Sequence, residues 1–334
     1  MTIPVIGFFN NKAGVGKTSL VYHLSWMFSD LGMRVLAADL DPQSNLTAAF
    51  IDEDKLASTL WGSRRASTVY QCLAPLIKGI GDIEAPDYEI IMDNLALVPG
   101  DMKLSGFEDE LSQDWPKCLD GKERSFRVVS AFWRITQNAA KRFGAGVIVV
   151  DLGPNLGAIN RAALIGADFV VIPLGPDLFS LQGLENLGPA LRQWRQEWKD
   201  RLVKRPRDIM ELPLGKIDTI GYMVIRHAIR LDRPVQAFER WIAKIPATYS
   251  KSVLGLAEPV RVDIDNDPNC IARLKDYRSL MPLVQEARKP MFHLTPADGA
   301  LGAHTQAVSS VREDFRKLAM EIAHRTRLPE ILQT

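Results

Sequence analysis

The sequence has few of the residues that cross-link small secreted proteins or hold structural metals. Its 334 residues include three cysteines, Cys72, Cys118 and Cys270, which are far apart in the chain. This number and spacing fit neither a disulfide framework nor a paired-cysteine metal site. The five histidines show no metal-ligand spacing either. A reducing cytoplasm of the bacterial type is the setting that we expect.

An excess of charge of one sign and long apolar runs are also missing. The 41 basic and 40 acidic side chains leave a net charge of +1, so no global field draws the protein to nucleic acid or a membrane. No apolar run approaches the roughly 18 residues of a membrane span, and the N-terminus resembles a strand rather than a leader. We therefore expect a soluble, unexported protein without membrane contact. With 46% hydrophobic residues, the chain can form one large α/β domain.

The most informative segment is Asn-Asn-Lys-Ala-Gly-Val-Gly-Lys-Thr at residues 10–18, with two lysines five positions apart. It follows an apolar strand and precedes an amphipathic helix that Gly32 ends, which is typical of a phosphate loop. Asn11 stands where the usual pattern has glycine, and asparagine tolerates left-handed backbone angles. Backbone N–H groups and the helix N-terminus would bind phosphate. The residues expected to bind a nucleoside triphosphate are Asn11, Ala13, Gly14, Val15, Gly16, Lys17, Thr18 and Ser19.

Carboxylates follow two predicted strands of the same sheet. Asp39 and Asp41 lie at the end of the strand at 34–39, and Asp151 closes the apolar run at 147–151. Since Mg²⁺ takes few protein ligands and keeps several waters, we expect Thr18, Asp39 and Asp151 to support it. Lys17 would reach the β and γ phosphates, and Asp41 would orient the attacking water. Caps of turns and strands are the alternative role for the aspartates.

The order of predicted elements indicates a doubly wound, mostly parallel α/β sheet flanked by helices. Further strands are expected at 95–99, 169–173 and 217–225, and helices at 68–77, 126–142, 158–166 and 181–202. The segment at 104–119 has no clear pattern. We predict a single P-loop ATPase domain over residues 1–334, with insertions near 52–94, 104–125 and 262–269.

Together these motifs resemble the ParA/MinD family of deviant Walker ATPases, in its ParA (Soj-like) branch. The matching segments are 12–18, 39–43, 147–157, 171–174 and 181–184, and the resemblance runs from Ile3 to about residue 323. It implies that Lys12 is a signature lysine that reaches the partner subunit's phosphates in an ATP-sandwiched homodimer. It also implies catalytic roles for Lys12, Lys17 and Asp41, and that Asp151 begins the second switch. Cations between two facing nucleotides would relieve their repulsion and link ATP to dimerisation.

The sequence departs from this family at three places. Ala13 stands where the family usually has glycine. Arg226 stands where many relatives have an asparagine that reads adenine, so adenine preference follows from the resemblance alone. The acidic segment at 262–269 has no clear counterpart in the family.

A basic face is predicted on the helix at 181–202, whose apolar face includes Trp194 and Trp198 as core residues. The residues expected to bind DNA phosphates without sequence preference are Arg192, Arg195, Lys199, Lys204, Arg205 and Arg207. Acidic residues are interspersed among them, so a solvated helix face is an equally good interpretation.

The leading hypothesis is an ATP-dependent dimerisation switch that positions or segregates DNA or another large cargo. Hydrolysis of ATP to ADP and phosphate would be Mg²⁺-dependent and stimulated by a partner protein, and DNA binding would place the dimer on the nucleoid. The alternative is a regulatory or assembly ATPase subunit of another system, such as defence or secretion, without DNA binding. A metabolic ligase or iron-sulfur carrier is weaker, because the chain lacks suitably placed cysteines and a recognisable substrate site. The final helix lacks the pattern of a membrane anchor.

Overall fold

The computed structural model describes residues 2–57, 67–225, 235–275 and 277–328. In these residues eight strands form one sheet in the order β3-β4-β2-β5-β1-β6-β7-β8. Only β3 is antiparallel to its neighbour. The predicted doubly wound, mostly parallel sheet is confirmed.

The elements have the following bounds. The strands are β1 (Val5–Phe8), β2 (Val35–Asp39), β3 (Glu89–Met92), β4 (Leu95–Val98), β5 (Val147–Asp151), β6 (Phe169–Leu174), β7 (Asp218–Ile225) and β8 (Cys270–Leu274). The helices are α1 (Lys17–Asp30), α2 (Asn45–Phe50), α3 (Glu53–Lys55), α4 (Val69–Ile77), α5 (Glu108–Lys117), α6 (Glu123–Val129), α7 (Ala131–Phe143), α8 (Ala158–Ile165), α9 (Leu178–Val203), α10 (Val235–Ile242), α11 (Ile245–Ser252), α12 (Met281–Ala287) and α13 (Ala303–Thr326).

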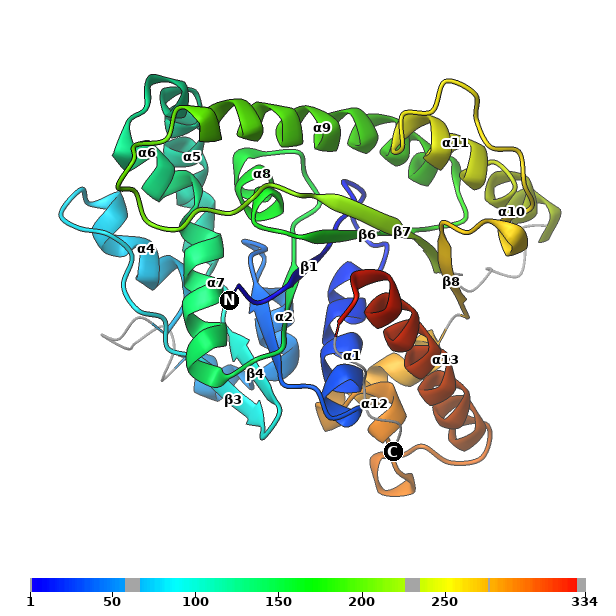
Figure 1. The fold of residues 1–334 in the computed structure, drawn as a ribbon. Coiled ribbons are helices and arrows are strands. Elements are labelled where there is room, and N and C mark those ends of the chain that lie inside the picture. The colour runs from blue at the N-terminus through cyan, green and yellow to red at the C-terminus, as the bar shows by residue number, and fades with distance from the viewer. Residues whose placement is uncertain (1, 58–66, 226–234, 276, 329–334) are drawn as a thin grey trace.

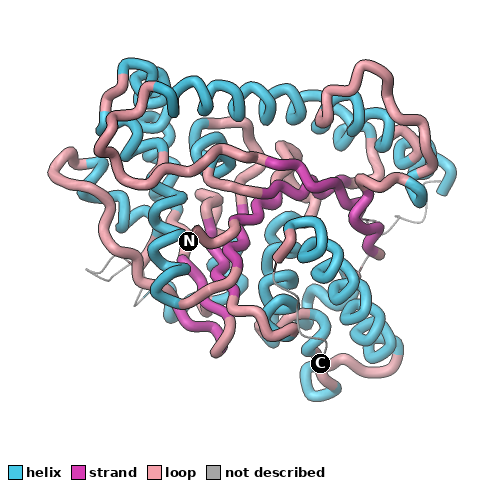
Figure 2. The backbone as a smooth tube through the Cα atoms, in the orientation of Figure 1, coloured by secondary structure: helices cyan, strands magenta, loops and turns pink. Residues whose placement is uncertain are grey.

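The sheet separates two hydrophobic cores. In β5, Val147 and Val149 belong to the core under α1 and α13, whereas Ile148 and Val150 belong to the core under α7, α8 and α9. Such strands are apolar on both faces because helices cover both sides of a parallel sheet. Figure 1 shows these two helical layers, and Figure 2 shows the strands as a continuous twisted band between them. The carboxyl ends of β1, β2, β5 and β6 therefore meet at one edge.

The structure corrects the sequence interpretation at several elements. The helix predicted at 126–142 is two helices, because the backbone of Ser130, with φ −91° and ψ 2°, leaves the helical region between α6 and α7. The Ser130 hydroxyl donates to the Phe126 carbonyl at 2.6 Å at this bend. The segment at 104–119 contains a 3-10 turn and α5. Neither β3, with Ile90 and Met92 exposed, nor β8 is predicted. Within the described residues no helix is long and apolar enough to span a membrane.

Helix α9 crosses one face of the molecule and packs closely on α11 (Figure 1). A Cβ atom on Gly188 would lie 1.9 Å from the Ser252 carbonyl oxygen, so the two helices can approach this closely only with glycine there. The predicted core tryptophans are confirmed, since Trp198 is fully buried and Trp194 nearly so.

Replacing Gly188 with alanine should destabilise the fold by about 3 kcal/mol, because the methyl group collides with backbone that cannot move away freely. Gly106→Ala is the matched control, since a Cβ there meets no atom within 4 Å. Urea unfolding of both variants measures the difference. Equal stability of the two would contradict the close α9–α11 packing.

Candidate functional site

The loop between β1 and α1 has the backbone geometry of a phosphate-binding turn. Gly14 and Gly16 have φ values of 73° and 81°, in the left-handed region that favours glycine. Asn11 does not have a positive φ, so the loop makes no use of the tolerance of asparagine for left-handed backbone angles. Its side chain instead lies near α9, where a Cβ on Gly183 would come 3.0 Å from the Asn11 Oδ1 atom. The Ala13 side chain is exposed.

Lys17 lies inside this loop, with only 7% of its surface exposed. Its ammonium group donates to the carbonyl oxygens of Asn10 at 3.0 Å and Lys12 at 3.2 Å. Burial lowers the pKa of Lys17, while the negative charges of Asp151 and Asp41 raise it. A buried cation thus lies where the N–H groups of the loop and of α1 converge, which suits a polyanionic ligand.

Asp39 and Asp151 end the neighbouring strands β2 and β5 and pair in register, and both side chains are fully buried. Asp39 Oδ2 accepts hydrogen bonds from the Thr47 amide at 2.8 Å and the Thr47 hydroxyl at 2.7 Å. In contrast, Asp151 Oδ2 accepts none from any residue in the described part of the chain. A buried carboxylate oxygen without a partner is costly unless a cation or ligand reaches it.

Both carboxylates are hard to ionise in the protein alone. Burial raises the pKa of Asp151 to about 8, and the neighbouring charge of Asp39 acts in the same direction, whereas Thr18 and Lys17 oppose it. Burial also raises the pKa of Asp39 to about 6, although its hydrogen bonds from Thr47 lower it. The Thr18 hydroxyl lies within hydrogen-bond reach of Asp151, and oxygen donors of this kind fit a hard divalent cation such as Mg²⁺.

Asp41 lies beyond the end of β2, as predicted, and is 6% exposed. Its Oδ1 atom accepts a hydrogen bond from the Gln43 amide at 2.9 Å. A Cβ on Gly153 would lie 3.2 Å from the same oxygen, so the loop after β5 closes against Asp41. In turn, the Asn160 side chain donates to the carbonyl oxygens of Gly153 and Asn155 and fixes that loop to α8.

Lys12 points away from this buried cluster. Its ammonium group forms an ion pair with Asp177 at 2.5 Å, and both side chains are about one-third exposed. The Lys12 amide donates to Asn10 Oδ1 at 2.9 Å, while the Asn10 side chain donates to the Pro173 carbonyl at 2.7 Å. The two lysines of the loop therefore have separate environments, one buried and one facing outward.

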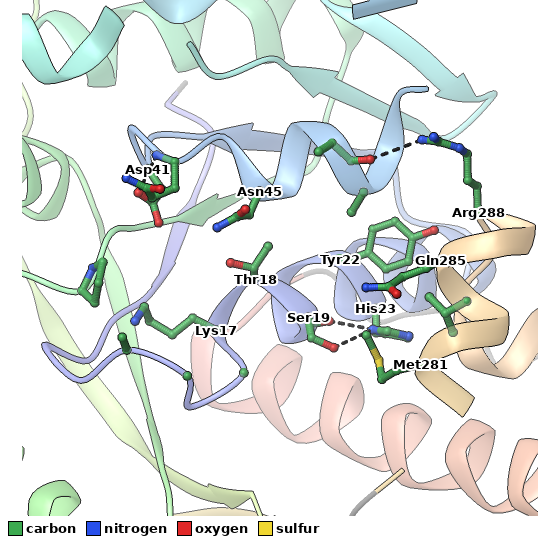
Figure 3. Close-up of a pocket in the computed structure, with 18 of the residues that line it drawn as sticks. Lys17, Thr18, Ser19, Tyr22, His23, Asp41, Asn45, Met281, Gln285 and Arg288 are labelled. Carbon is green, nitrogen blue, oxygen red and sulfur yellow. Dashed lines mark hydrogen bonds between the residues drawn. The ribbon is translucent and has the colours of Figure 1, made fainter. Parts of the chain in front are cut away.

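A cavity of about 710 Å³ opens beside the phosphate loop. Lys17, Thr18 and Asp41 lie at one end, and α12 contributes Met281 and Gln285 at the other (Figure 3). A cavity of this volume is large enough for a nucleotide. Arg226 lies outside the described residues.

The wall of this cavity is held by α12 and by a neutral histidine. Arg288, just after α12, donates to the Ala48 carbonyl of α2 at 3.3 Å (Figure 3). It also donates to the Ile51 carbonyl at 2.8 Å and so ties the α12 segment to the end of α2. His23 Nδ1 lies 2.7 Å from the Ser19 carbonyl, and burial lowers the pKa of His23 to about 4. His23 is therefore uncharged at neutral pH and shapes the cavity without adding charge.

The predicted basic face is only partly free. Arg192 donates to the carbonyl oxygens of Ser252 and Val253, and Arg195 donates to the carbonyl oxygen of Ile217. These two guanidinium groups fasten α9 to neighbouring segments. Arg192 nevertheless stays exposed, as do Lys199, Lys204, Arg205 and Arg207, and Arg205 also donates to the Leu202 carbonyl at 3.1 Å.

Several residues of the site were missed from the sequence. Thr47 and Gly100 brace Asp39, since the Gly100 amide donates to the Thr47 hydroxyl at 2.8 Å. No local pattern connects these positions. Asp177 was also missed, although its place just beyond a predicted parallel strand, at the edge where ligands bind, was a usable signal.

Comparisons with known proteins agree with this geometry. The family model AAA_31, described as "AAA domain", matches residues 3–204, more than half of the chain. The chain therefore belongs to this family. The chromosome partitioning protein ParA of Caulobacter vibrioides is 29% identical over 203 residues, which cover 60% of this chain and 66% of that protein. The predicted resemblance to the ParA branch is confirmed, and the chain spans somewhat less than two thirds of this relative's length.

Two solved structures share the fold over almost the whole chain. Protein DIP2308 from Corynebacterium diphtheriae has a TM-score of 0.71 at 23% identity, covering 97% of this chain and 98% of its own. A complex of Cyanothece McdA(D38A) with ATP has a TM-score of 0.61 at 14% identity, covering 99% of both chains. At these identities the likeness establishes the fold alone.

Asp151→Asn should stabilise the protein without metal or nucleotide at pH 8 by about 2 kcal/mol, because it removes a buried charge beside Asp39. An unfolded aspartate has a pKa of about 3.9, and the folded Asp151 a pKa of about 8. The free energy of unfolding of the wild type therefore falls as the pH rises between these values. The variant lacks this loss, because asparagine does not ionise. Thermal unfolding in EDTA at pH 8 and pH 5 tests this, and the difference between variant and wild type should be smaller at pH 5, where less of the ionisation cost has accumulated. Identical melting at pH 8 would contradict the buried charge.

Proposed function

We propose that this chain is an Mg²⁺-dependent ATPase of the ParA type. It binds ATP at the phosphate loop, hydrolyses it to ADP and phosphate, and acts as a dimer that positions or segregates DNA or another large cargo. The observation that carries this proposal is the division between the two lysines of one loop. Lys17 is buried beside Asp151 and Asp41, while Lys12 is outside that cluster and partly exposed.

In this proposal the loop from Asn11 to Ser19 binds the phosphates, and the cavity beside it accommodates part of the nucleotide. Lys17 contacts the β and γ phosphates from inside the loop. Adenine as the base is supported by the family and by the solved McdA complex with ATP, which is a property of that protein. The cargo is not specified by these residues.

Thr18 and Asp151 are the proposed Mg²⁺ ligands, and the orphaned Asp151 Oδ2 atom supports this assignment. Magnesium bound there would neutralise phosphate charge during hydrolysis. Asp39 braces the site, because its Oδ2 atom already accepts two hydrogen bonds from Thr47. Asp41 orients the attacking water, and its contact with Gly153 lets the loop after Asp151 respond to the γ phosphate.

Lys12 is the proposed link between ATP and dimerisation. From its outward position it would contact the phosphates of the partner subunit, so the dimer would form with two nucleotides between its subunits. A partner protein would stimulate the slow hydrolysis and release the dimer.

DNA is the proposed ligand of the exposed basic residues at the end of α9, Lys199, Lys204, Arg205 and Arg207. Dimerisation would double this patch and make binding ATP-dependent. The alternative, a regulatory or assembly subunit without DNA binding, is favoured by the engagement of Arg192 and Arg195 with backbone carbonyl groups.

Lys17→Ala and Lys12→Ala form a matched pair of variants in one loop. Lys17→Ala should lose ATP binding, because the cation facing the phosphates is gone. Lys12→Ala should still bind ATP but no longer dimerise with Mg²⁺ and a slowly hydrolysed analogue. Titration with a fluorescent ATP analogue and analytical sedimentation measure the two effects. Micromolar ATP binding by Lys17→Ala, or a normal ATP-dependent dimer of Lys12→Ala, would contradict the assigned roles.

Duplex DNA binding should require ATP, ignore sequence and weaken steeply with salt, with a slope of roughly 0.9 per phosphate neutralised. Lys199→Glu/Lys204→Glu should weaken binding and lower the slope by about two. Arg312→Glu/Lys317→Glu, on exposed positions of α13, makes the same change of charge on the opposite face and should have little effect. Filter binding over a salt series measures this. If the wild type with ATP shows no DNA retention at low salt, the regulatory-subunit alternative replaces the DNA proposal.

A further inference from the structure

Lys12 is already bound to a carboxylate of its own subunit. Its ammonium group lies 2.5 Å from Asp177 Oδ2, and the exposed fractions of the two side chains are 28% and 31%. The ring of Phe179, itself 66% exposed, has its centre 5.9 Å from the same ammonium group. The pair is thus accessible, and it lies on a surface that also displays an aromatic side chain.

Both partners of this ion pair are held in place by their backbones. Lys12 is anchored through Asn10, which connects its amide to the end of β6. Asp177 is the N-cap of α9, where its Oδ1 atom accepts a hydrogen bond from the Ser180 amide at 3.1 Å. A Cβ on Gly175 would lie 2.7 Å from Asp177 Oδ2, so glycine at this position leaves room for the carboxylate. The Lys12 side chain thus reaches from a fixed backbone position to a carboxylate that a helix cap holds in place.

We propose that the Lys12–Asp177 pair is an autoinhibitory latch that holds the free subunit in a resting state. The inference rests on the proposed function, in which Lys12 serves the partner subunit's phosphates. One ammonium group cannot remain at Asp177 and also move out to another subunit. Dimerisation must therefore break the pair in each subunit, and the free energy of the pair opposes dimerisation by the same amount.

The latch also connects Lys12 to α9. Asp177 caps the first turn of α9, and Gly183 in the second turn lies against Asn11 and Asn10 of the phosphate loop. Release of Lys12 leaves Asp177 with its capping role alone. Dimerisation is therefore favoured only if Lys12 binds the phosphates of the partner subunit more strongly than it binds Asp177.

Asp177→Asn isolates the charge, because asparagine caps a helix about as well as aspartate and so preserves the start of α9. With Mg²⁺ and a slowly hydrolysed ATP analogue, this variant should dimerise at a protein concentration about two- to fivefold lower per latch released, the effect of a partly exposed ion pair. Asp177→Ser keeps a capping side chain and removes the same charge, so it provides a second variant that should behave alike. Asp177→Glu, which keeps the charge, should stay near the wild type.

Glu89→Gln is the matched control, since it removes the carboxylate of an ion pair of equal length, Lys55–Glu89 at 2.5 Å, far along the sheet from the loop. Sedimentation of all variants over a concentration series gives the midpoints. Unchanged or weaker dimerisation of both Asp177→Asn and Asp177→Ser, with Lys12→Ala unable to dimerise, would overturn the latch and leave the proposed function intact. Normal ATP-dependent dimerisation of Lys12→Ala would remove the proposed function and the latch together.

Discussion

Two buried carboxylates placed side by side are the constraint on which the site depends. Asp39 and Asp151 end adjacent parallel strands in register and are closed off from water. Burial is the largest cause of the raised pKa of each carboxyl group, and neighbouring carboxylates add to it, Asp41 at Asp39 and Asp39 at Asp151. Thr47 donates two hydrogen bonds to Asp39, whereas Asp151 Oδ2 has no hydrogen-bond partner among the residues that the structure describes. A cation beside the phosphate loop would therefore stabilise the ionised form of these carboxylates.

The two lysines of the loop lie at different distances from these carboxylates and have different partners. Lys17 is drawn inward, where its burial is compensated by carbonyl oxygens and by the nearby carboxylates. Lys12, five residues earlier, lies outside the cluster and takes a separate partner, Asp177. The proposed function assigns nucleotide binding to the inner lysine and contact between subunits to the outer one.

Local patterns predicted the central part of this structure correctly. Apolar runs followed by aspartate predicted β2 and β5, and the parallel arrangement placed Asp39 and Asp151 at one edge. The elements that could not be predicted depend on contacts between distant residues. Ser130 divides a continuous helical pattern, and α5 carries the carboxylate of Glu108, which accepts hydrogen bonds from the Ala158 and Ile159 amides fifty residues away. Arg192 and Arg195 looked free in the sequence because their carbonyl partners are backbone atoms of distant segments.

The central claim is that the paired carboxylates and Lys17 form a site for a magnesium nucleotide. Equilibrium binding of a slowly hydrolysed ATP analogue to the wild-type protein, with Mg²⁺ and with EDTA, tests it most directly. Because Mg²⁺ would connect the Asp151 carboxylate to the phosphates, the analogue should bind at least about tenfold more tightly with Mg²⁺, a difference of roughly 1.4 kcal/mol. Equal affinity under both conditions would contradict the account, since the buried carboxylates would then have no part in holding the nucleotide.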